Sequence, residues 1–239
     1  FWTARYDWLP VKDALVAQEL RKNGIKTICN SVQTTMLCFD KWETHNFLEK
    51  NNFHHARGVL VKHDLYFCAG NQKDVIENVY KESILAQIKE LIFPVVIKDN
   101  VGLSSYGMAV ANTFGEVTNY LNSKKNNSDR IVEEYIDGQQ FGTEIYGCKG
   151  NYSVLPPFKF SVNQYGITSP KLSTKFGPFY ENYELLESEL QKMASELELE
   201  GCAQVDLVLK DGKWYVIEIN PRLSGMTLTY SAAMNMSVY

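Results

Sequence analysis

The chain has 239 residues, of which 45% are hydrophobic and 22% charged, and its formal net charge at pH 7 is −4. This length can bury a sizeable core in one large or two modest domains, and the composition is that of an ordinary globular protein. The negative net charge argues against a nucleic-acid-binding surface, and no apolar run approaches transmembrane length. We therefore predict that neither a nucleic acid nor a membrane is a partner.

Five cysteines are scattered along the chain without a CxxC spacing: Cys29, Cys38, Cys68, Cys148 and Cys202. This pattern is typical of reduced thiols, and no secretory signal peptide is visible, so we predict a cytoplasmic protein. The chain opens at Phe1 without a methionine and stops at Tyr239 within a segment of helical pattern. We therefore expect a fragment of a longer protein.

The first elements predicted in chain order are helices with one short strand. Residues 10–23 carry apolar side chains at helical spacing, at Val11, Leu15, Val16 and Leu20, and a strand is predicted over residues 26–29. Further helices are predicted over residues 40–51 and 73–91, the second of which stops before Pro94. The four histidines, His45, His54, His55 and His63, lack metal-ligand spacing, and we expect them to be solvated.

A segment with the features of a phosphate-binding loop follows. Residues 93–98 form a short apolar strand that ends at Lys98, residues 99–107 form a loop rich in Gly and Ser, and residues 108–111 form a second apolar run. Such a loop offers backbone N–H groups and hydroxyls to phosphate oxygens, although Gly and Ser clusters also mark plain turns. Neither GxxxxGK[ST] nor GxGxxG is present.

The second half of the chain predicts further strands and one long helix. Residues 130–136 form a strand that carries the paired acids Glu133 and Glu134 and breaks at Gly138. Antiparallel strands are predicted over residues 141–147 and 152–158. An amphipathic helix is predicted over residues 183–200, with an apolar stripe of Leu186, Leu190, Met193 and Leu197. The connection between them, residues 159–182, is too long for a plain turn and has the length of an active-site lid.

The most informative stretch is the predicted hairpin at residues 204–220, which collects polar side chains on one face. Side chains alternate faces along a strand, so Asp206 and Glu218 share a face only if the connection has an odd number of residues. We predict a three-residue loop, Lys210 to Gly212, with Gly212 left-handed. Asp206 and Glu218 would then be diagonal neighbours roughly 7 Å apart at the backbone.

Asn220 follows on the same side of this hairpin. Carboxylate and amide oxygens without sulfur or imidazole suit a hard cation such as Mg²⁺ or Mn²⁺, which is often held by one or two carboxylates and the phosphates of a nucleotide. Taken alone, the hairpin fits equally well a solvated face of an ordinary amphipathic pair of strands.

In this order the phosphate-loop segment, the acidic strand and the hairpin resemble the ATP-grasp superfamily of carboxylate–amine ligases, which includes D-alanine–D-alanine ligases, carbamoyl-phosphate synthetases and L-amino-acid ligases. Asp40-Lys41 is similar to the Asp-Lys pair that opens the central domain of that family. The resemblance runs from Thr34 to about Ser231. It implies an α/β (α+β) ATP-grasp fold in which two subdomains grip ATP. The domains implied are the tail of a Rossmann-like domain at residues 1–33, a central subdomain at 34–136 and a C-terminal subdomain at 137–239.

The resemblance also implies the nucleotide contacts. Lys41 and Lys98 would contact the phosphates, and Ser104 and Ser105 would close over them, although a lone lysine is more often a solvated charge than a ligand. Residues that would edge the adenine ring and the ribose are Glu133, Glu134, Tyr135, Ile136 and Gln140. Gln140 stands where the family usually has an acid, and an amide can still hydrogen-bond a ribose hydroxyl. The metal positions would be Asp206, Glu218 and Asn220.

The resemblance also implies two catalytic residues, Arg222 and Lys98, of which Arg222 would contact the substrate. D-Alanine–D-alanine ligases carry an arginine where this chain has Gln204, and Arg222 would supply a compensating charge. The run from Glu218 to Gly225 looks more like the carbamoyl-phosphate-synthetase and amino-acid-ligase branch. A guanidinium fits a carboxylate or an acyl phosphate bidentately, although a surface ion pair would also explain Arg222. In similar ligases the long loop can offer a lysine to the γ-phosphate, here Lys171 or Lys175.

The activity implied is an ATP-dependent carbon–nitrogen ligation. A carboxylate, that of an amino acid, would be phosphorylated by ATP to an acyl phosphate, and an amine would then displace phosphate. The partners would be a small-molecule carboxylate and an amine, and a homodimer is left open. Two alternatives remain: an ATP-grasp carboxylase or kinase-type enzyme, and a non-catalytic or regulatory ATP-binding module, which Gln140 and Gln204 would favour.

Overall fold

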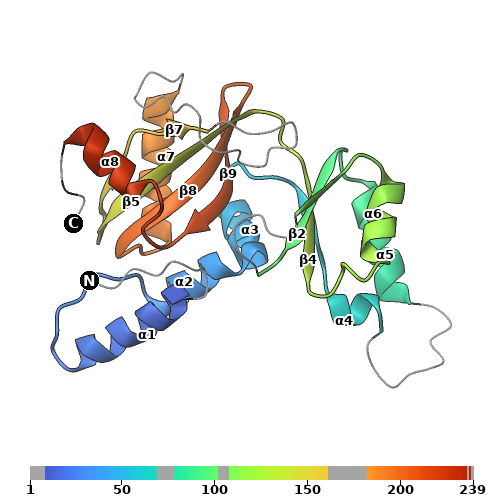
Figure 1. Cartoon of the computed structure of the whole chain (residues 1–239), viewed down its shortest axis with the longest axis horizontal. Helices are drawn as coiled ribbons and strands as arrows, with labels where there is room; N and C mark the ends of the chain where they lie inside the picture. The colour runs from blue at the N-terminus through green and yellow to red at the C-terminus, as the bar shows by residue number, and fades with distance from the viewer. Residues whose placement is uncertain (1–8, 69–77, 102–107, 161–181, 236, 238–239) are drawn as a thin grey trace.

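The structure is a computed structural model that describes residues 9–68, 78–101, 108–160, 182–235 and 237. Two antiparallel sheets lie side by side, and helices from the N-terminal part of the chain pass beneath the second sheet (Figure 1). Each sheet has its own cluster of buried side chains. The architecture is therefore two mixed α and β units in one chain.

The first sheet has the strand order β1-β4-β2-β3. Its strands are β1 (Gly58–Val61), β2 (Val95–Asp99), β3 (Ala109–Ala111) and β4 (Arg130–Glu134), and every neighbouring pair is antiparallel. Three helices accompany it: α4 (His63–Tyr66), α5 (Val79–Lys89) and α6 (Phe114–Leu121). Apolar side chains of α5 and α6 pack on the sheet, and Ile88, Val117 and Leu121 have no exposed surface.

The second sheet has the order β6-β5-β8-β9, with a short β7 that pairs with β5. Its strands are β5 (Gln139–Cys148), β6 (Asn151–Val154), β7 (Phe158–Lys159), β8 (Gly201–Lys210) and β9 (Lys213–Asn220). Helix α7 (Tyr183–Glu196) covers one face with the predicted stripe of Leu186, Leu190 and Met193. Helix α8 (Thr227–Met234) joins a separate cluster with Leu155 and Phe158.

Three helices precede the first sheet in the chain: α1 (Leu9–Lys22), α2 (Val32–Phe39) and α3 (Lys41–Lys50). Cys38 of α2 and Leu48 of α3 belong to the buried cluster of the second sheet. The sequence-based division at residues 33/34 and 136/137 stays a prediction. Within it, α2 and α3 lie against the C-terminal sheet although they belong to the central segment of the chain (Figure 1).

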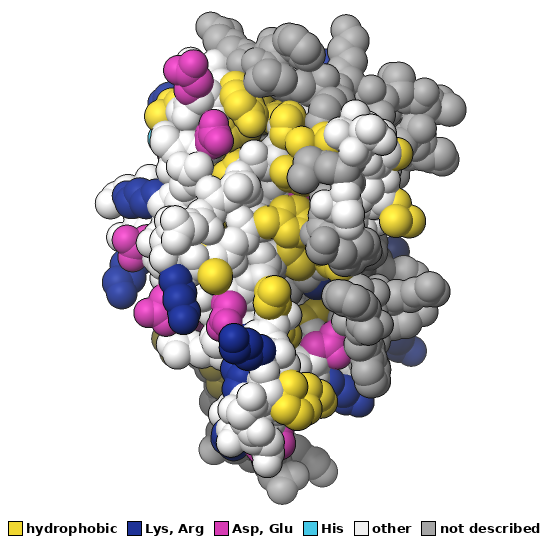
Figure 2. Space-filling model, turned by 90° about the vertical axis from the view of Figure 1, so that its left-hand side faces the viewer, with side chains coloured by type: hydrophobic (Ala, Val, Ile, Leu, Met, Phe, Trp, Pro, Cys, Tyr) yellow, Lys and Arg dark blue, Asp and Glu magenta, His cyan; other side chains and the backbone are white. Residues whose placement is uncertain are grey.

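Two N-terminal predictions are wrong. Residues 26–29 form no strand, because the carbonyls of Thr27 and Cys29 accept hydrogen bonds from the Arg21 guanidinium at 3.3 and 2.7 Å. The predicted apolar face of α1 is also displaced: Leu15 and Val16 are 52% and 55% exposed, whereas the small residues Ala14 and Ala17 are buried. Figure 2 views this side of the molecule and shows hydrophobic side chains at its surface.

Candidate active site

The β8–β9 hairpin places Asp206 and Glu218 on one face, but its turn differs from the predicted one. The turn has two residues, Asp211 and Gly212, both with positive φ (49° and 72°), and Lys210 pairs with Lys213. The predicted three-residue loop is therefore wrong. Parity is instead changed inside β9, where the register shifts between Asp206 and Leu207 and Ile217 is left without a partner. The extra residue is thus a β-bulge and not part of the turn.

The bulge brings the predicted metal residues to one face of the sheet. Asp206 lies directly opposite Glu218, not diagonal to it, and Gln204 lies opposite Asn220. The bulge also changes which side chains enter the core: Trp214 and Val216 are buried on the turn side of it, and Ile219 beyond it, while Tyr215 and Ile217 are half-buried.

Hydrogen bonds link these polar side chains into a row. Gln204 Nε2 donates to Asp206 Oδ1 at 2.7 Å, and Asn220 Nδ2 donates to Gln204 Oε1 at 2.9 Å. Because its nitrogen is engaged by Gln204, Asn220 directs Oδ1 toward the other side, where Arg222 Nη2 donates to it at 3.4 Å. Gln204 is therefore the residue that orients Asp206 and Asn220.

Lys41 is aimed at this face by the start of α3. Asp40 caps the helix by accepting from the N–H groups of Trp42 and Glu43, and its Oδ2 also accepts from the Asn100 side chain at 3.1 Å. The Lys41 N–H donates to the carbonyl of Asn100 at 3.1 Å. The segment that follows β2 is thus tied to the first turn of α3, a connection that the sequence reading missed.

The Lys41 ammonium forms an ion pair with Glu218, with Nζ and Oε1 3.1 Å apart. Burial would raise the pKa of Glu218, but Lys41 and Lys98 outweigh that effect and hold the pKa below its usual value. Glu218 is therefore ionised at neutral pH. An ionised carboxylate is what a metal ligand must be.

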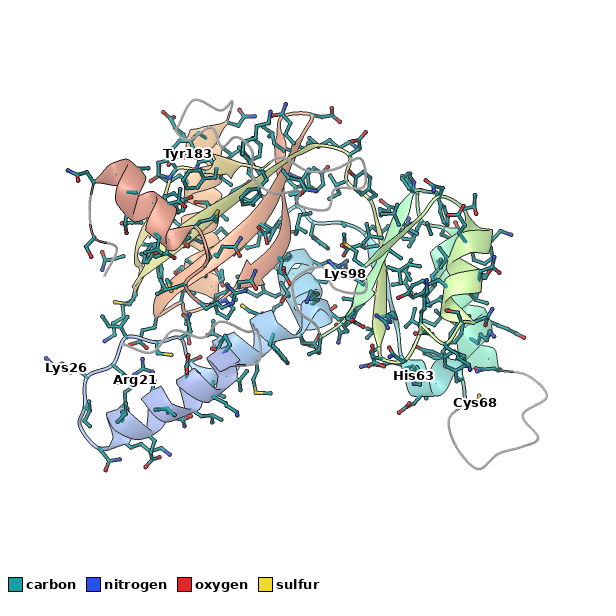
Figure 3. The ribbon with its side chains drawn as sticks, viewed as in Figure 1. Arg21, Lys26, His63, Cys68, Lys98 and Tyr183 are labelled. Carbon is teal, nitrogen blue, oxygen red and sulfur yellow. The ribbon has the colours of Figure 1, made fainter. Side chains whose placement is uncertain are left out.

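Lys98 and Glu133 form a second ion pair, at 2.6 Å, across the first sheet. Lys98 lies on β2 and Glu133 on the neighbouring β4, and both side chains are largely buried, with 14% and 13% of their surface exposed. Lys98 lies where the first sheet faces α3, so its ammonium is close to the second sheet as well (Figure 3). The structure thus brings the predicted phosphate and adenine residues together.

A hollow between the sheets is lined by both ion pairs. Its volume is about 390 Å³ when the space that is open to solvent is counted, and its polar lining residues include Lys41, Lys98, Glu133 and Glu218. A second hollow of about 290 Å³ shares Cys38, Lys41 and Glu218 with the first and continues to Asn220 and Arg222. The two hollows connect the predicted nucleotide residues with the predicted substrate arginine.

Two histidines also line the first hollow, which corrects the expectation that all four are solvated. The rings of His45 and His55 meet edge to face with centroids 4.4 Å apart, and Trp42 stacks on His45 at 4.6 Å. Burial, with help from His55 and Lys98, lowers the pKa of His45 to about 4. His45 is therefore neutral at physiological pH. His54 is exposed, as predicted.

The remaining nucleotide residues lie at the crossing between the sheets. Glu134 Oε1 accepts from the Ile92 N–H at 3.0 Å, and the Tyr135 N–H donates to the carbonyl of Pro94 at 3.0 Å. Both groups are thus used to hold the crossing segment. Ile136 follows in that segment, and Gln140 lies on β5 opposite Val208.

Several predicted residues lie outside the part of the chain that the structure describes: Ser104, Ser105, Lys171, Lys175 and most of the predicted lid. Within the described residues no group of three or more His, Cys, Asp or Glu side chains is placed to hold a metal ion. The predicted set has two carboxylates and one amide, so it relies on oxygen donors from a ligand to complete a coordination shell.

A family model described as ATP-grasp domain matches residues 38–226. The chain is 28% identical over 221 residues to the D-alanine–D-alanine ligase of Buchnera aphidicola subsp. Schizaphis graminum. The aligned region covers 87% of this chain and 68% of that ligase. The chain is 21% identical over 224 residues to the carbamoyl phosphate synthase arginine-specific large chain of Bacillus subtilis, covering 92% of the chain but only 20% of that protein.

Solved structures show the same fold. The D-alanine–D-alanine ligase of Bacillus anthracis complexed with ATP superposes with a TM-score of 0.63 at 20% identity, over 94% of this chain and 69% of that one. The L-amino acid ligase of Bacillus licheniformis gives 0.64 at 20% identity, over 91% and 47%. The predicted fold class is confirmed. None of the helices in the described part is long and apolar enough to cross a membrane.

Proposed function

The chain belongs to the ATP-grasp family, and from this premise we propose that it joins the carboxylate of an amino acid to an amine through an acyl phosphate. The predicted enzyme class, an ATP-dependent carbon–nitrogen ligase, and the predicted cofactors, ATP and Mg²⁺, are confirmed at the level of the family. One observation carries the proposal for this chain: Asp206 and Glu218 face each other beside Lys41, next to a hollow that Lys98 also lines.

The residues present fit a magnesium ion. Asp206, Glu218 and Asn220 offer oxygen atoms from one sheet face, and the Gln204 side chain fixes the orientation of two of them. When bound, the metal would neutralise negative charge that develops on the transferred phosphoryl group. Lys41 at present neutralises Glu218, so a metal ion at Glu218 would release the ammonium toward a phosphate.

The nucleotide would occupy the hollow between the sheets. Lys98 would contact phosphate oxygens and Glu133 would accept from the exocyclic amine of adenine, so that ATP separates the present ion pair between them. With the Tyr135 N–H bonded to Pro94 and Glu134 bonded to Ile92, the ring would be read by the backbone of Ile136. Gln140 would hydrogen-bond the ribose, and Ser104 and Ser105 would close over the phosphates.

The proposed reaction has two steps. A carboxylate oxygen of the first substrate attacks the γ-phosphorus, the bond from that phosphorus to the bridging oxygen breaks, and ADP leaves. The amine then attacks the acyl carbon, phosphate leaves with the former carboxylate oxygen, and the amine loses a proton. Arg222 would hold the carboxylate and then the acyl phosphate with its planar fork. Positioning and charge neutralisation are the protein's main contributions.

The test is trapping with hydroxylamine. The chain is incubated with ATP, Mg²⁺ and each amino acid of a panel that includes D-alanine, and hydroxamate and ADP are measured together. An acyl phosphate gives hydroxamate in step with ADP, and omission of the amino acid should abolish both. Release of ADP without hydroxamate from any carboxylate would contradict the proposal and favour a kinase-type reaction. The same assay with bicarbonate tests a carboxylase.

A binding-only module is the second candidate, and one observation favours it. Gln204 is buried and neutral at the position where D-alanine–D-alanine ligases have an arginine, so the reacting centre has one cation fewer. Against it, the two carboxylates and the amide expected of the metal site are all present. Binding of Mg²⁺–ATP without turnover across the panel would decide for this candidate. The substrates, a homodimer and a cytoplasmic location remain predictions.

A further inference from the structure

Glu144 is a buried carboxylate for which the proposed reaction has no use. It lies on β5 opposite Gln204, on the same sheet face as the predicted metal residues, and only 1% of its surface is exposed. The ion pairs among the described residues do not include Glu144. An ionised carboxylate is costly to bury without strong partners, so the groups that donate to it identify what it does.

Three hydroxyl groups donate to Glu144, and two of them come from the segment that follows Arg222. Ser224 Oγ and Thr227 Oγ1 donate to Oε1 at 2.5 and 2.7 Å. The third donor, Tyr146 OH, lies two residues away on β5 and reaches the other oxygen, Oε2, at 2.5 Å. The carboxylate thus joins the interior of β5 to residues that lie 80 and 83 positions later in the chain.

The segment is closed upon itself around this anchor. The Ser224 N–H donates to Thr227 Oγ1 at 3.1 Å, and the Met226 N–H donates to Ser224 Oγ at 2.9 Å. Met226 is 4% exposed and packs with Tyr230 of α8 in the third buried cluster. The turn is therefore fixed at Glu144 on one side and by apolar packing on the other.

Arg222 is bonded to this segment as well as to Asn220. Its Nη1 donates to the carbonyl of Leu223 at 3.2 Å, and its backbone N–H donates to the carbonyl of Asn220 at 2.7 Å. A shift of the segment would therefore move the guanidinium. Glu144 and Arg222 also have a common neighbour in Cys202: burial first and Glu144 after it raise the pKa of that thiol to about 12, and Arg222 opposes them.

We propose that Glu144 is a positioning residue that holds the segment after Arg222 through Ser224 and Thr227, and thereby aims the Arg222 guanidinium into the site. The claim that the guanidinium meets a substrate carboxylate rests on the proposed function. The claim that Glu144 orders Arg222 rests on the contacts alone, so the two can fail separately.

The chain offers matched variants. Ser224→Ala combined with Thr227→Val removes the two hydroxyls of the segment and leaves Glu144 in place. Glu144→Leu removes the acceptor itself. Tyr146→Phe is the comparison variant, because it removes the third hydroxyl from the same carboxylate, and with it the hydroxyl's interaction with Thr227, but keeps both hydroxyls of the segment.

The measurement is ¹⁵N relaxation of the arginine Nε–H groups in the full chain, with the Arg222 signal identified by Arg222→Lys. The order parameter of this group should fall by about a third or more in Ser224→Ala/Thr227→Val and in Glu144→Leu, and by clearly less in Tyr146→Phe, which keeps the hydrogen bonds from Ser224 and Thr227 to Glu144. The folded state of each variant is checked on the signal of Arg130, which is buried in the first sheet. An unchanged Arg222 signal in Ser224→Ala/Thr227→Val would overturn the proposal.

Titration of each variant with ATP and Mg²⁺ separates this inference from the proposed function. Because the nucleotide residues lie away from the segment, the three variants should bind ATP within about twofold of the wild type. A wild type that binds no ATP would overturn the proposed function, while the relaxation data, which need no ligand, would still decide the role of Glu144. If Ser224→Ala/Thr227→Val lost affinity for ATP as well as order at Arg222, the result would contradict a role of Glu144 that is confined to Arg222.

Discussion

Asp206 lies directly opposite Glu218 in the β8–β9 hairpin because Ile217 bulges out of the register between them and the turn. Without that bulge the two-residue turn would place the two carboxylates on opposite faces of the sheet. One added residue therefore brings together the pair on which the metal assignment depends. The bulge is a functional feature of the hairpin, as bulges beside active sites commonly are.

Replacing Asp206 with Asn should remove metal affinity and leave the fold intact. An Asn oxygen can still accept the hydrogen bond from Gln204, so thermal stability should change little. The affinity for Mn²⁺ in the presence of ATP, followed by electron paramagnetic resonance, should fall at least about tenfold because one anionic ligand is lost. Asp211→Asn in the turn of the same hairpin is the control. Equal affinity in Asp206→Asn and the control would exclude Asp206 as a ligand.

Lys98→Met should weaken ATP more than adenosine. The lost contact is with phosphate, so we expect a rise of about tenfold or more in the dissociation constant of ATP and less than about twofold in that of adenosine. Because the change leaves Glu133 without its ion pair, the double variant Lys98→Met/Glu133→Gln is measured beside it. Lys89→Met, at an exposed position of α5, controls for net charge. A similar loss for both ligands would contradict the phosphate role.

Protonation of His45 should destabilise the protein in mildly acidic solution. The unfolded chain takes up a proton near pH 6.5, whereas burial holds the folded pKa at about 4. Between these two pH values the unfolded state therefore binds more protons than the folded state. The free energy of unfolding has its full value above pH 6.5 and falls as the pH drops toward 4. His55 and Lys98, which line the same hollow, oppose the added charge, and the acids Glu133 and Glu218 partly offset them.

The size of this effect is limited by the partial solvent exposure of His45. After allowance for that exposure we expect a loss of about 1–2 kcal/mol in the free energy of unfolding between pH 7 and pH 5. His45→Gln should remove this part of the pH dependence in urea unfolding, while His54→Gln, at an exposed position, should keep it. Identical pH profiles for the wild type and His45→Gln would show that His45 is not buried in neutral form.

Arg222→Ala should impair the reaction and spare nucleotide binding. The guanidinium lies in the second hollow, beside Asn220 and away from the Lys98–Glu133 pair. We expect ATP affinity within about twofold of the wild type and a fall of about a hundredfold or more in hydroxamate formation, because a bidentate contact to the reacting group is lost. Arg57→Ala, at an exposed arginine, is the matched control. Normal hydroxamate formation in Arg222→Ala would show that Arg222 has no part in the reaction.

Much of this fold follows from local sequence signals. The bounds of α3 were predicted within a residue because Asp40 caps its start and Asn51 ends it. The stripe of α7 was predicted because Leu186, Leu190 and Met193 repeat at helical spacing and have one sheet to cover. The polar set of the hairpin was predicted from its residue types.

The errors concern features that the local sequence does not encode. Asp211-Gly212 carries the usual signal of a two-residue turn, and it forms one, but nothing in β9 marks Ile217 as a bulge. The buried face of α1 is decided by the surface that it meets, which prefers Ala14 and Ala17. The burial of His45 likewise depends on His55, which reaches it from the loop after α3.

The central claim is that Glu218 helps to bind Mg²⁺–ATP, and calorimetric titration tests it most directly. ATP is titrated into the wild-type chain and into Glu218→Gln, each with and without Mg²⁺. The account predicts binding to the wild type that is at least about tenfold tighter with Mg²⁺, and a variant in which Mg²⁺ gives little or no gain. Binding to the wild type that is indifferent to Mg²⁺, or a variant that gains as much from Mg²⁺ as the wild type, would contradict it.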